Sequence, residues 1–249
     1  MNEFFVDVKT SDGAMECFAV HPEEEGPFPA IILYMDMPGI REELYEFTRK
    51  IAKQGYFCLL PDMFYREGRI RFDLAKGREE IDKMFVVGAT LNHEKVMRDT
   101  EGMLDYFDNQ RNVEGPVGCI GYCMSGRYVV GAAGTFPEQF AAVASLYGVG
   151  IVTDQPDSPH LLAEKIKGEL YLGFASEDPF VGPEVIPEIE KTFDQHGVSY
   201  VVEVHPDTEH GFCFPERPAY VEHAAEKVWD IVFDLLIESS KCKVLGLIE

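Results

Sequence analysis

The chain has 249 residues, and 46% of them are hydrophobic, which is enough for one large core. We therefore predict a single domain over residues 1–249. The formal net charge is −22, so the electrostatic field repels phosphate backbones and anionic lipid surfaces, which argues against a nucleic-acid partner. The sequence has no apolar run long enough to span a bilayer, which argues against a membrane protein.

The cysteines and the first residues indicate the compartment. Glu3 and Asp7 interrupt the N-terminal stretch, which lacks the basic start and apolar core of a secretory signal. The chain has six cysteines, and their spacing is that of neither a metal site nor a small disulfide scaffold: Cys17, Cys58, Cys119, Cys123, Cys213 and Cys242. We therefore predict a cytoplasmic protein with reduced thiols, no metal and no organic cofactor. The sequence does not indicate an oligomeric state.

The first half of the chain alternates between predicted strands and helices. Residues 3–10 and 14–20 alternate apolar and polar side chains around a Ser-Asp-Gly turn, which predicts an antiparallel hairpin. The further predicted elements are strands over 30–35 and 56–60 and helices over 41–54 and 92–109. Between them, residues 63–91 follow no single period and are interpreted as short helices and loops.

The second half continues this alternation. Strands are predicted over 117–120, 140–146, 168–174 and 199–204, and helices over 124–135, 161–166, 183–196 and 220–237, with a loop over 206–218 and a loose tail over 238–249. The pattern predicts an α/β fold with a mostly parallel central sheet, an N-terminal antiparallel hairpin and helices on both faces. In such a sheet, the loops at the carboxyl ends of the strands meet at one rim, where ligands bind.

Cys123 stands at one of these ends, in the stretch G-Y-C-M-S-G. A strand that runs through a tight turn into a helix is the pattern of a nucleophile elbow, and the start of the helix favours a thiolate. Gly121 fits the need for small residues beside the nucleophile. Ser125 stands where the motif prefers glycine, and Gly126 follows it. A buried structural cysteine after a glycine turn remains an alternative interpretation.

Two further strand ends supply a candidate acid and a candidate base. Asp178 follows the strand over 168–174, and His210 follows the last strand, so that nucleophile, acid and histidine have the chain order of α/β-hydrolases. Taken singly, an aspartate before proline is usually a turn residue, and a histidine before glycine usually belongs to a loop. The weaker candidates are His205, His196, Glu177 and Asp207.

Acyl transfer also needs donors for the oxyanion. In this architecture they are the backbone N–H of the residue after the nucleophile and one from the loop after an earlier strand. This nominates the amides of Met124 and Met37.

With these motifs, the chain resembles the dienelactone hydrolase family of α/β-hydrolases. The resemblance extends over nearly the whole chain and is carried by residues 31–39, P-D-M-F-Y, G-Y-C-M-S-G, S-E-D-P-F-V, H-G-F and the pattern over 217–229. It implies that Cys123, Asp178 and His210 form the catalytic triad and that Met37 and Met124 are the oxyanion donors.

The resemblance also implies roles for residues at which this chain departs from the family. Members carry a glutamate beside the nucleophile, and this chain has the shorter Asp36 at that place. The best-known members bind a substrate carboxylate with two arginines. Arg78 matches one of them, or is a surface charge on a helix, whereas Phe214 stands at the place of the other, with Arg217 slightly later.

We therefore expect a hydrolase of small esters or lactones with a cysteine nucleophile. Two alternatives remain. One is a thioesterase or other acyl hydrolase, and the second is a catalytically degenerate protein that responds to oxidation through its thiol or only binds a ligand.

Overall fold

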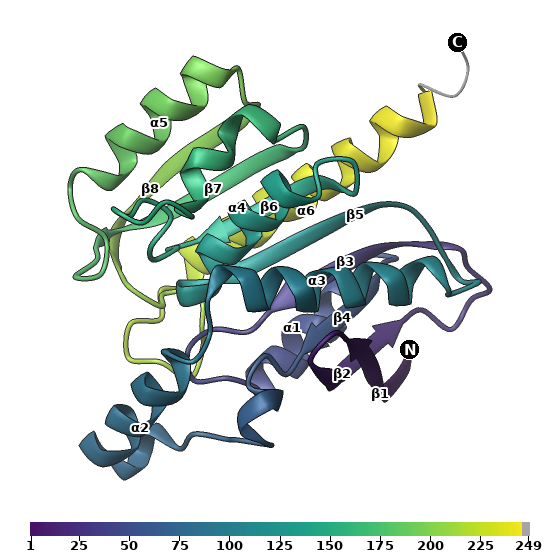
Figure 1. The fold of residues 1–249 in the computed structure, drawn as a ribbon, viewed down its shortest axis with the longest axis horizontal. Helices are drawn as coiled ribbons and strands as arrows, with labels where there is room; N and C mark the ends of the chain where they lie inside the picture. The colour runs from purple at the N-terminus through teal and green to yellow at the C-terminus, as the bar shows by residue number, and fades with distance from the viewer. Residues whose placement is uncertain (246–249) are drawn as a thin grey trace. The chain divides into compact units, whose positions relative to one another are not determined.

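The two halves of the chain form separate compact units. The structure, a computed structural model, describes the backbone of residues 1–245 and the side chains of residues 1–239. Unit 1 spans Met1–Glu114 and unit 2 spans Gly115–Glu249. Each unit combines strands with helices, as Figure 1 shows. The single domain predicted over 1–249 stays a prediction.

Unit 1 contains the N-terminal hairpin. Its strands are β1 (Asn2–Thr10), β2 (Gly13–His21), β3 (Phe28–Tyr34) and β4 (Phe57–Pro61), in the order β1-β2-β4-β3. The hairpin pairs antiparallel, with Asn2 opposite His21 and Thr10 opposite Gly13, and β3 pairs parallel with β4. The helices are α1 (Glu42–Ala52), α2 (Arg78–Gly88) and α3 (His93–Asp108). Helix α1 packs on β2 and β4, and α3 packs on β1.

Helix α3 begins where the sequence predicts. The Asn92 side chain accepts a hydrogen bond from the Lys95 N–H at 2.9 Å, which satisfies one of the open donors of the first turn. An apolar stripe that includes Val96, Met103 and Phe107 is buried along the helix. Cap and stripe together explain why this helix was predicted to within one residue at each end.

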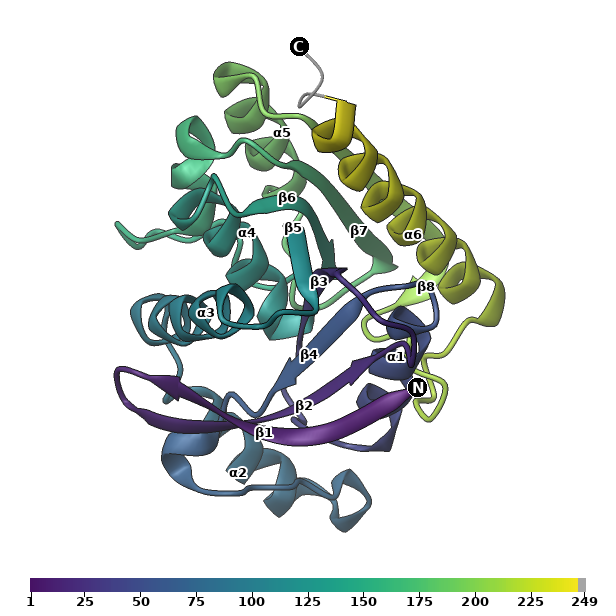
Figure 2. The ribbon, with the colours of Figure 1, turned by 90° about the vertical axis from the view of Figure 1, so that its right-hand side faces the viewer.

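Unit 2 contains a parallel sheet that is covered on both faces. Its strands are β5 (Val113–Tyr122), β6 (Phe140–Leu146), β7 (Glu169–Glu177) and β8 (Tyr200–Glu209), which pair in parallel in the order of the chain. The helices are α4 (Gly126–Thr135), α5 (Val185–His196) and α6 (Glu222–Leu245). Figure 2 shows α4 and α5 on one side of these strands and α6 on the other. The predicted mostly parallel sheet with an antiparallel hairpin and helices on both faces is thus confirmed.

Strands β7 and β8 extend beyond the predicted ends, and the loop predicted from residue 206 is wrong at its start. After a bulge at Ala175, pairing resumes with Glu177 opposite Glu209. In the bulge, the Thr208 N–H donates to Ser176 Oγ, and Ser176 Oγ donates to the Thr208 carbonyl, both at 3.2 Å. These side-chain bonds replace ladder bonds, and Pro206 is tolerated because β8 is the last strand of its unit.

The C-terminal helix is also longer than predicted. The helix predicted to end at residue 237 continues to Leu245 in α6. The loose tail expected over 238–249 stays a prediction. Residues 246–249 lie outside the described residues.

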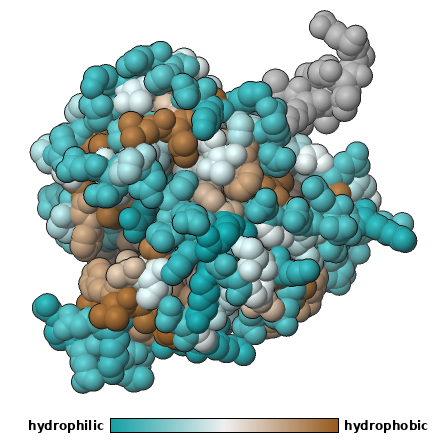
Figure 3. Space-filling model, viewed as in Figure 1, coloured by the Kyte–Doolittle hydropathy of each residue, from teal (hydrophilic) through white to brown (hydrophobic). Residues whose placement is uncertain are grey.

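Residues 63–91 form short helices, as predicted. The 3-10 turns η1 (Tyr65–Glu67) and η2 (Leu74–Lys76) precede α2. In α2 only Met84 and Gly88 are buried, whereas Phe85 and Val86 are exposed. Figure 3 shows mostly teal, hydrophilic residues at the lower left, where Figure 1 draws this helix, with brown, hydrophobic residues above them. Among the described residues no helix has the length and apolarity that crossing a bilayer requires.

Candidate active site

Cys123 occupies a strained turn between β5 and α4. Its φ is +53°, in the left-handed region that costs a residue with a Cβ about 1–2 kcal/mol. It begins the 3-10 turn η3 (Cys123–Ser125), and its carbonyl accepts hydrogen bonds from the N–H groups of Gly126 and, at 3.0 Å, of Val149. The predicted elbow geometry is therefore present around this thiol.

Glycines make this turn possible. A Cβ on Gly121 would lie 2.5 Å from the Ser125 carbonyl oxygen, and a Cβ on Gly126 would lie 2.2 Å from the Gly148 Cα. Ser125, the departure from the motif, has a buried side chain that the turn accommodates. In this chain, Gly126 is thus the residue after the nucleophile whose backbone packs closely against a neighbouring segment.

The pairing of β7 with β8 brings the candidate acid and base together. Asp178 and His210 directly follow the paired residues Glu177 and Glu209. The imidazole Nδ1 and Asp178 Oδ2 are 2.8 Å apart, and both side chains are largely buried. The acid–histidine geometry expected of such a pair is therefore present.

The charge state of His210 follows from its neighbours. Burial lowers its pKa, but the hydrogen bond to Asp178 and the interactions with the Cys123 sulfur outweigh burial and raise the pKa to about 9. The ring is thus an imidazolium at neutral pH. Its Nε2 is buried and has no nitrogen or oxygen partner among the described residues. Since Asp178 occupies Nδ1, Nε2 is the atom left for the thiol.

Cys123 differs from the other described cysteines in exposure. It is partly exposed, whereas Cys17, Cys58, Cys119 and Cys213 are buried. Burial raises the pKa of the thiols of Cys17, Cys58 and Cys119 well above the usual value. These thiols stay protonated, so the cysteine with access and an imidazolium partner is Cys123.

Two aromatic side chains that the sequence reasoning missed contact His210. The ring centroids of Tyr147 and Phe180 lie 5.0 Å and 4.8 Å from that of the imidazole. Tyr147 has a φ of +39°, and its N–H donates to the Gly173 carbonyl at 2.6 Å. Two features of the sequence could have indicated these contacts. Tyr147 stands at a strand end, directly before Gly148, and Phe180 stands two residues after Asp178.

The weaker candidates have other surroundings. His205 is buried in β8, with Nε2 2.8 Å from the Tyr171 hydroxyl. His196 ends α5, and Glu177 lies within β7. Asp207 is exposed with a φ of +55°, and it lies in β8 and not in the loop predicted over 206–218.

Asp36, Met37 and Arg78 belong to unit 1. The Asp36 carboxylate is buried and accepts two hydrogen bonds from the Arg41 guanidinium, at 2.5 Å and 3.2 Å, and Arg41 also donates to Glu43 at 2.7 Å. No motif in the sequence indicated this ion pair. The predicted roles of Asp36 beside the thiol and of the Met37 amide as an oxyanion donor stay predictions.

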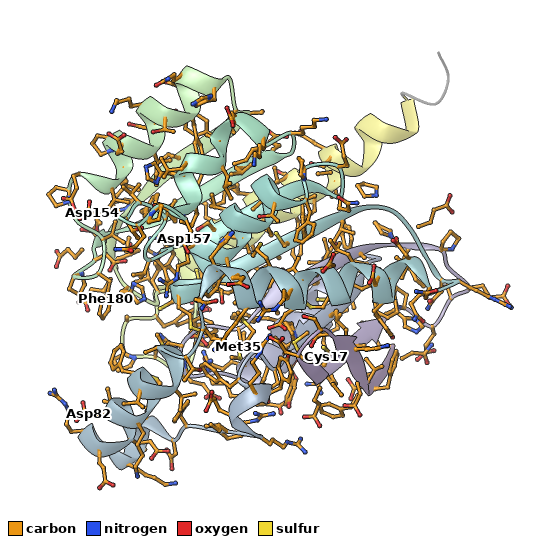
Figure 4. The ribbon with its side chains drawn as sticks, viewed as in Figure 1. Cys17, Met35, Asp82, Asp154, Asp157 and Phe180 are labelled. Atoms are coloured by element: carbon orange, nitrogen blue, oxygen red, sulfur yellow. The ribbon has the colours of Figure 1, made fainter. Side chains whose placement is uncertain are left out.

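Arg78 lies on the outside of α2. Its side chain is 88% exposed and pairs with Asp82, one helical turn later, at 2.9 Å. Figure 4 labels Asp82 at the surface of this helix. This pairing is typical of a surface charge, so it favours that interpretation over substrate binding. Among the described residues, no three His, Cys, Asp or Glu side chains lie together as metal ligands would.

Comparison with known proteins identifies the family of the chain. A Synechocystis protein named "Putative carboxymethylenebutenolidase" is 27% identical over 88% of this chain and 89% of its own length. A structure titled "Putative Dienelactone Hydrolase" from Klebsiella pneumoniae has a TM-score of 0.83, with 18% identity, 94% coverage of this chain and 98% of that chain.

A dienelactone hydrolase-like promiscuous phosphotriesterase from metagenomic libraries has a TM-score of 0.76, with 22% identity and coverage of 96% of this chain and 99% of that chain. The model of the dienelactone hydrolase family matches residues 15–240. The match covers most of the sequence, including the stretches that gave the resemblance. The chain therefore belongs to the dienelactone hydrolase family, and it is an α/β-hydrolase of the ester- and lactone-hydrolysing kind.

Proposed function

We propose that the protein hydrolyses small esters or lactones with a catalytic triad of Cys123, His210 and Asp178. The single observation that carries this proposal is the hydrogen bond between Asp178 and His210, which fixes the imidazole while Nε2 stays available to a thiol on a strained turn. A cationic imidazole is the partner that stabilises a thiolate, so in this proposal the reaction starts from a Cys123 thiolate beside the His210 imidazolium.

Acylation follows from this pair. The Cys123 thiolate attacks the carbonyl carbon, and a tetrahedral oxyanion forms. When this intermediate collapses, the carbon–oxygen bond to the leaving group breaks and the His210 Nε2–H gives its proton to the departing oxygen. The products of this step are an alcohol and a thioester of Cys123, with a neutral imidazole.

Deacylation restores the starting pair of the proposed reaction. The neutral imidazole takes a proton from water while the water oxygen attacks the thioester carbonyl. The sulfur then leaves as a thiolate, and His210 is again an imidazolium. The Asp178 carboxylate keeps Nδ1 protonated, so that Nε2 faces the reacting atoms in both steps. The net reaction converts ester and water into acid and alcohol, and the scheme needs no metal or organic cofactor.

Backbone amides supply the oxyanion donors of the proposal. Met124 follows Cys123 at the start of η3, and its N–H is the donor that an elbow provides. The resemblance adds the Met37 N–H and a carboxylate, Asp36, near the thiol. We also propose a cytoplasmic location, since the described cysteines are free.

Replacement of Cys123 by alanine tests the proposal. We expect kcat/KM for phenyl acetate and for a small lactone to fall by about a thousandfold or more, because both steps need the sulfur. The matched control is Cys119→Ala, which removes a buried thiol from β5, the strand that leads into Cys123, and should leave the rates within a few fold.

Mass spectrometry provides the complementary measurement. Quenching during turnover should trap one acyl group on the peptide that contains Cys123. Full hydrolysis by Cys123→Ala would refute the proposal. Reversible oxidation of Cys123 without any acylation would instead favour the redox-responsive alternative, and acylation only by thioesters would favour a thioesterase.

A further inference from the structure

The His210 imidazole has aromatic rings as neighbours on a buried and on an exposed side. The Tyr147 ring contacts it at an interplanar angle of 65° and is fully buried. The Phe180 ring contacts it at an interplanar angle of 70° and is 53% exposed. Tyr147 therefore closes the protein side of the imidazole. The Phe180 ring borders the side that a substrate can reach.

The position of Phe180 is fixed by the candidate acid. Its N–H donates to Asp178 Oδ1 at 2.9 Å, while Oδ2 of the same carboxylate binds the His210 Nδ1. The Val181 N–H adds a bond to the Asp178 carbonyl at 3.3 Å. Figure 4 labels Phe180 in this turn after β7. One carboxylate thus positions both the imidazole and the ring beside it.

Exposed apolar side chains are common on protein surfaces and need no function. Phe180 differs from such a residue because its ring touches the imidazole that donates the proton in acylation. The leaving oxygen must lie within about 3 Å of Nε2 to receive this proton. The atoms attached to that oxygen then lie beside the imidazole, within reach of a ring whose centroid is 4.8 Å away.

We propose that Phe180 is a specificity-determining residue that contacts the leaving group and selects flat, apolar alcohols, such as phenols and enols, over small aliphatic ones. This inference rests on the proposed function. Aromatic groups gain from stacked or edge-to-face contact with such a ring, and the removal of the ring should cost about tenfold in rate for an aromatic leaving group.

Two acetates with reactive leaving groups test the inference, because they share the acyl part. Phenyl acetate carries an aromatic leaving group, and trifluoroethyl acetate carries an aliphatic one. In Phe180→Ala we expect kcat/KM to fall about tenfold for phenyl acetate and by less than about twofold for trifluoroethyl acetate. Phe5→Ala is the matched control, since Phe5 is also 53% exposed but lies on β1. It should leave unchanged the ratio of kcat/KM for phenyl acetate to kcat/KM for trifluoroethyl acetate.

An equal fall for both acetates would overturn the inference, because the ring would then only hold the imidazole. No fall in kcat/KM for either acetate in Phe180→Ala would overturn it as well. Phe180→Leu keeps apolar bulk without a flat ring, so it should also lower the ratio, and it replaces the alanine variant if that does not fold. Failure of the proposed function is a separate result, since Cys123→Ala would then keep full activity whatever the ratio is.

Discussion

Gly126 offers a quantitative test of how the elbow is built. Its φ of −57° is ordinary for a helix, so alanine meets no backbone strain there. The obstacle is steric, because the new Cβ would lie 2.2 Å from the Gly148 Cα and 2.6 Å from Ser145 Oγ. Carbon atoms prefer separations near 3.5–4.0 Å, so the backbone would have to move by more than about 1 Å. Overpacking of this kind costs about 3 kcal/mol.

The expected result for Gly126→Ala is a loss of about 3 kcal/mol in the free energy of unfolding, measured by urea denaturation. A displacement of about 1 Å at Cys123 should also lower kcat/KM by about a hundredfold. Gly197→Ala is the control for conformational strain alone, because Gly197 has a φ of +68° and a Cβ added there would meet no other part of the chain within 4 Å. It should cost about 1 kcal/mol without loss of activity. Stability and activity of Gly126→Ala equal to wild type would refute the reasoning.

The remaining predictions concern a titrating group and a buried hydroxyl. The folded pKa of His210 is raised from 6.5 to about 9, so its contribution to stability is full below pH 6.5 and is lost as the pH rises to about 9. Urea denaturation across this range should show the decline in wild type and a flatter profile in His210→Gln, and equal slopes would contradict the assigned ion pair. Ser145 Oγ is buried and has no hydrogen-bond partner among the described residues, so Ser145→Ala should leave the free energy of unfolding unchanged or raise it slightly. A loss above about 1 kcal/mol would show that the hydroxyl is satisfied.

The fold was predictable where a pattern was continuous and its ends were marked. Residues 140–146 are apolar except for Ser145, and β6 has these bounds in the structure. The end of β8 was missed because Pro206 and Asp207 are typical of turns. Their strand conformation depends on Thr208 and Ser176, which are 32 positions apart and bond across the bulge. Local composition does not contain such a long-range contact.

In the candidate site too, the features that local sequence patterns mark were predictable, and those that depend on long-range contacts were not. Chain order and strand ends were enough to nominate Asp178 and His210, and their hydrogen bond is now explained by the register of β7 and β8. The contact of Tyr147 with His210 depends on a left-handed φ that few non-glycine residues adopt, so its aromatic ring resembled an ordinary core residue. The Arg41 partner of Asp36 lies just before α1, where the sequence indicated only the start of a helix.

Cys123 and Tyr147, two strained residues at the ends of neighbouring strands, support each other. Each left-handed residue costs about 1–2 kcal/mol, and such strain persists only where the surroundings determine the conformation. Here the Val149 N–H binds the Cys123 carbonyl, and Gly126 packs against Gly148 in the turn after Tyr147. The tight approach that the elbow requires is therefore made by Gly126. The serine at position 125 is thus no sign of a disabled elbow, which weakens the argument for a degenerate member of the family.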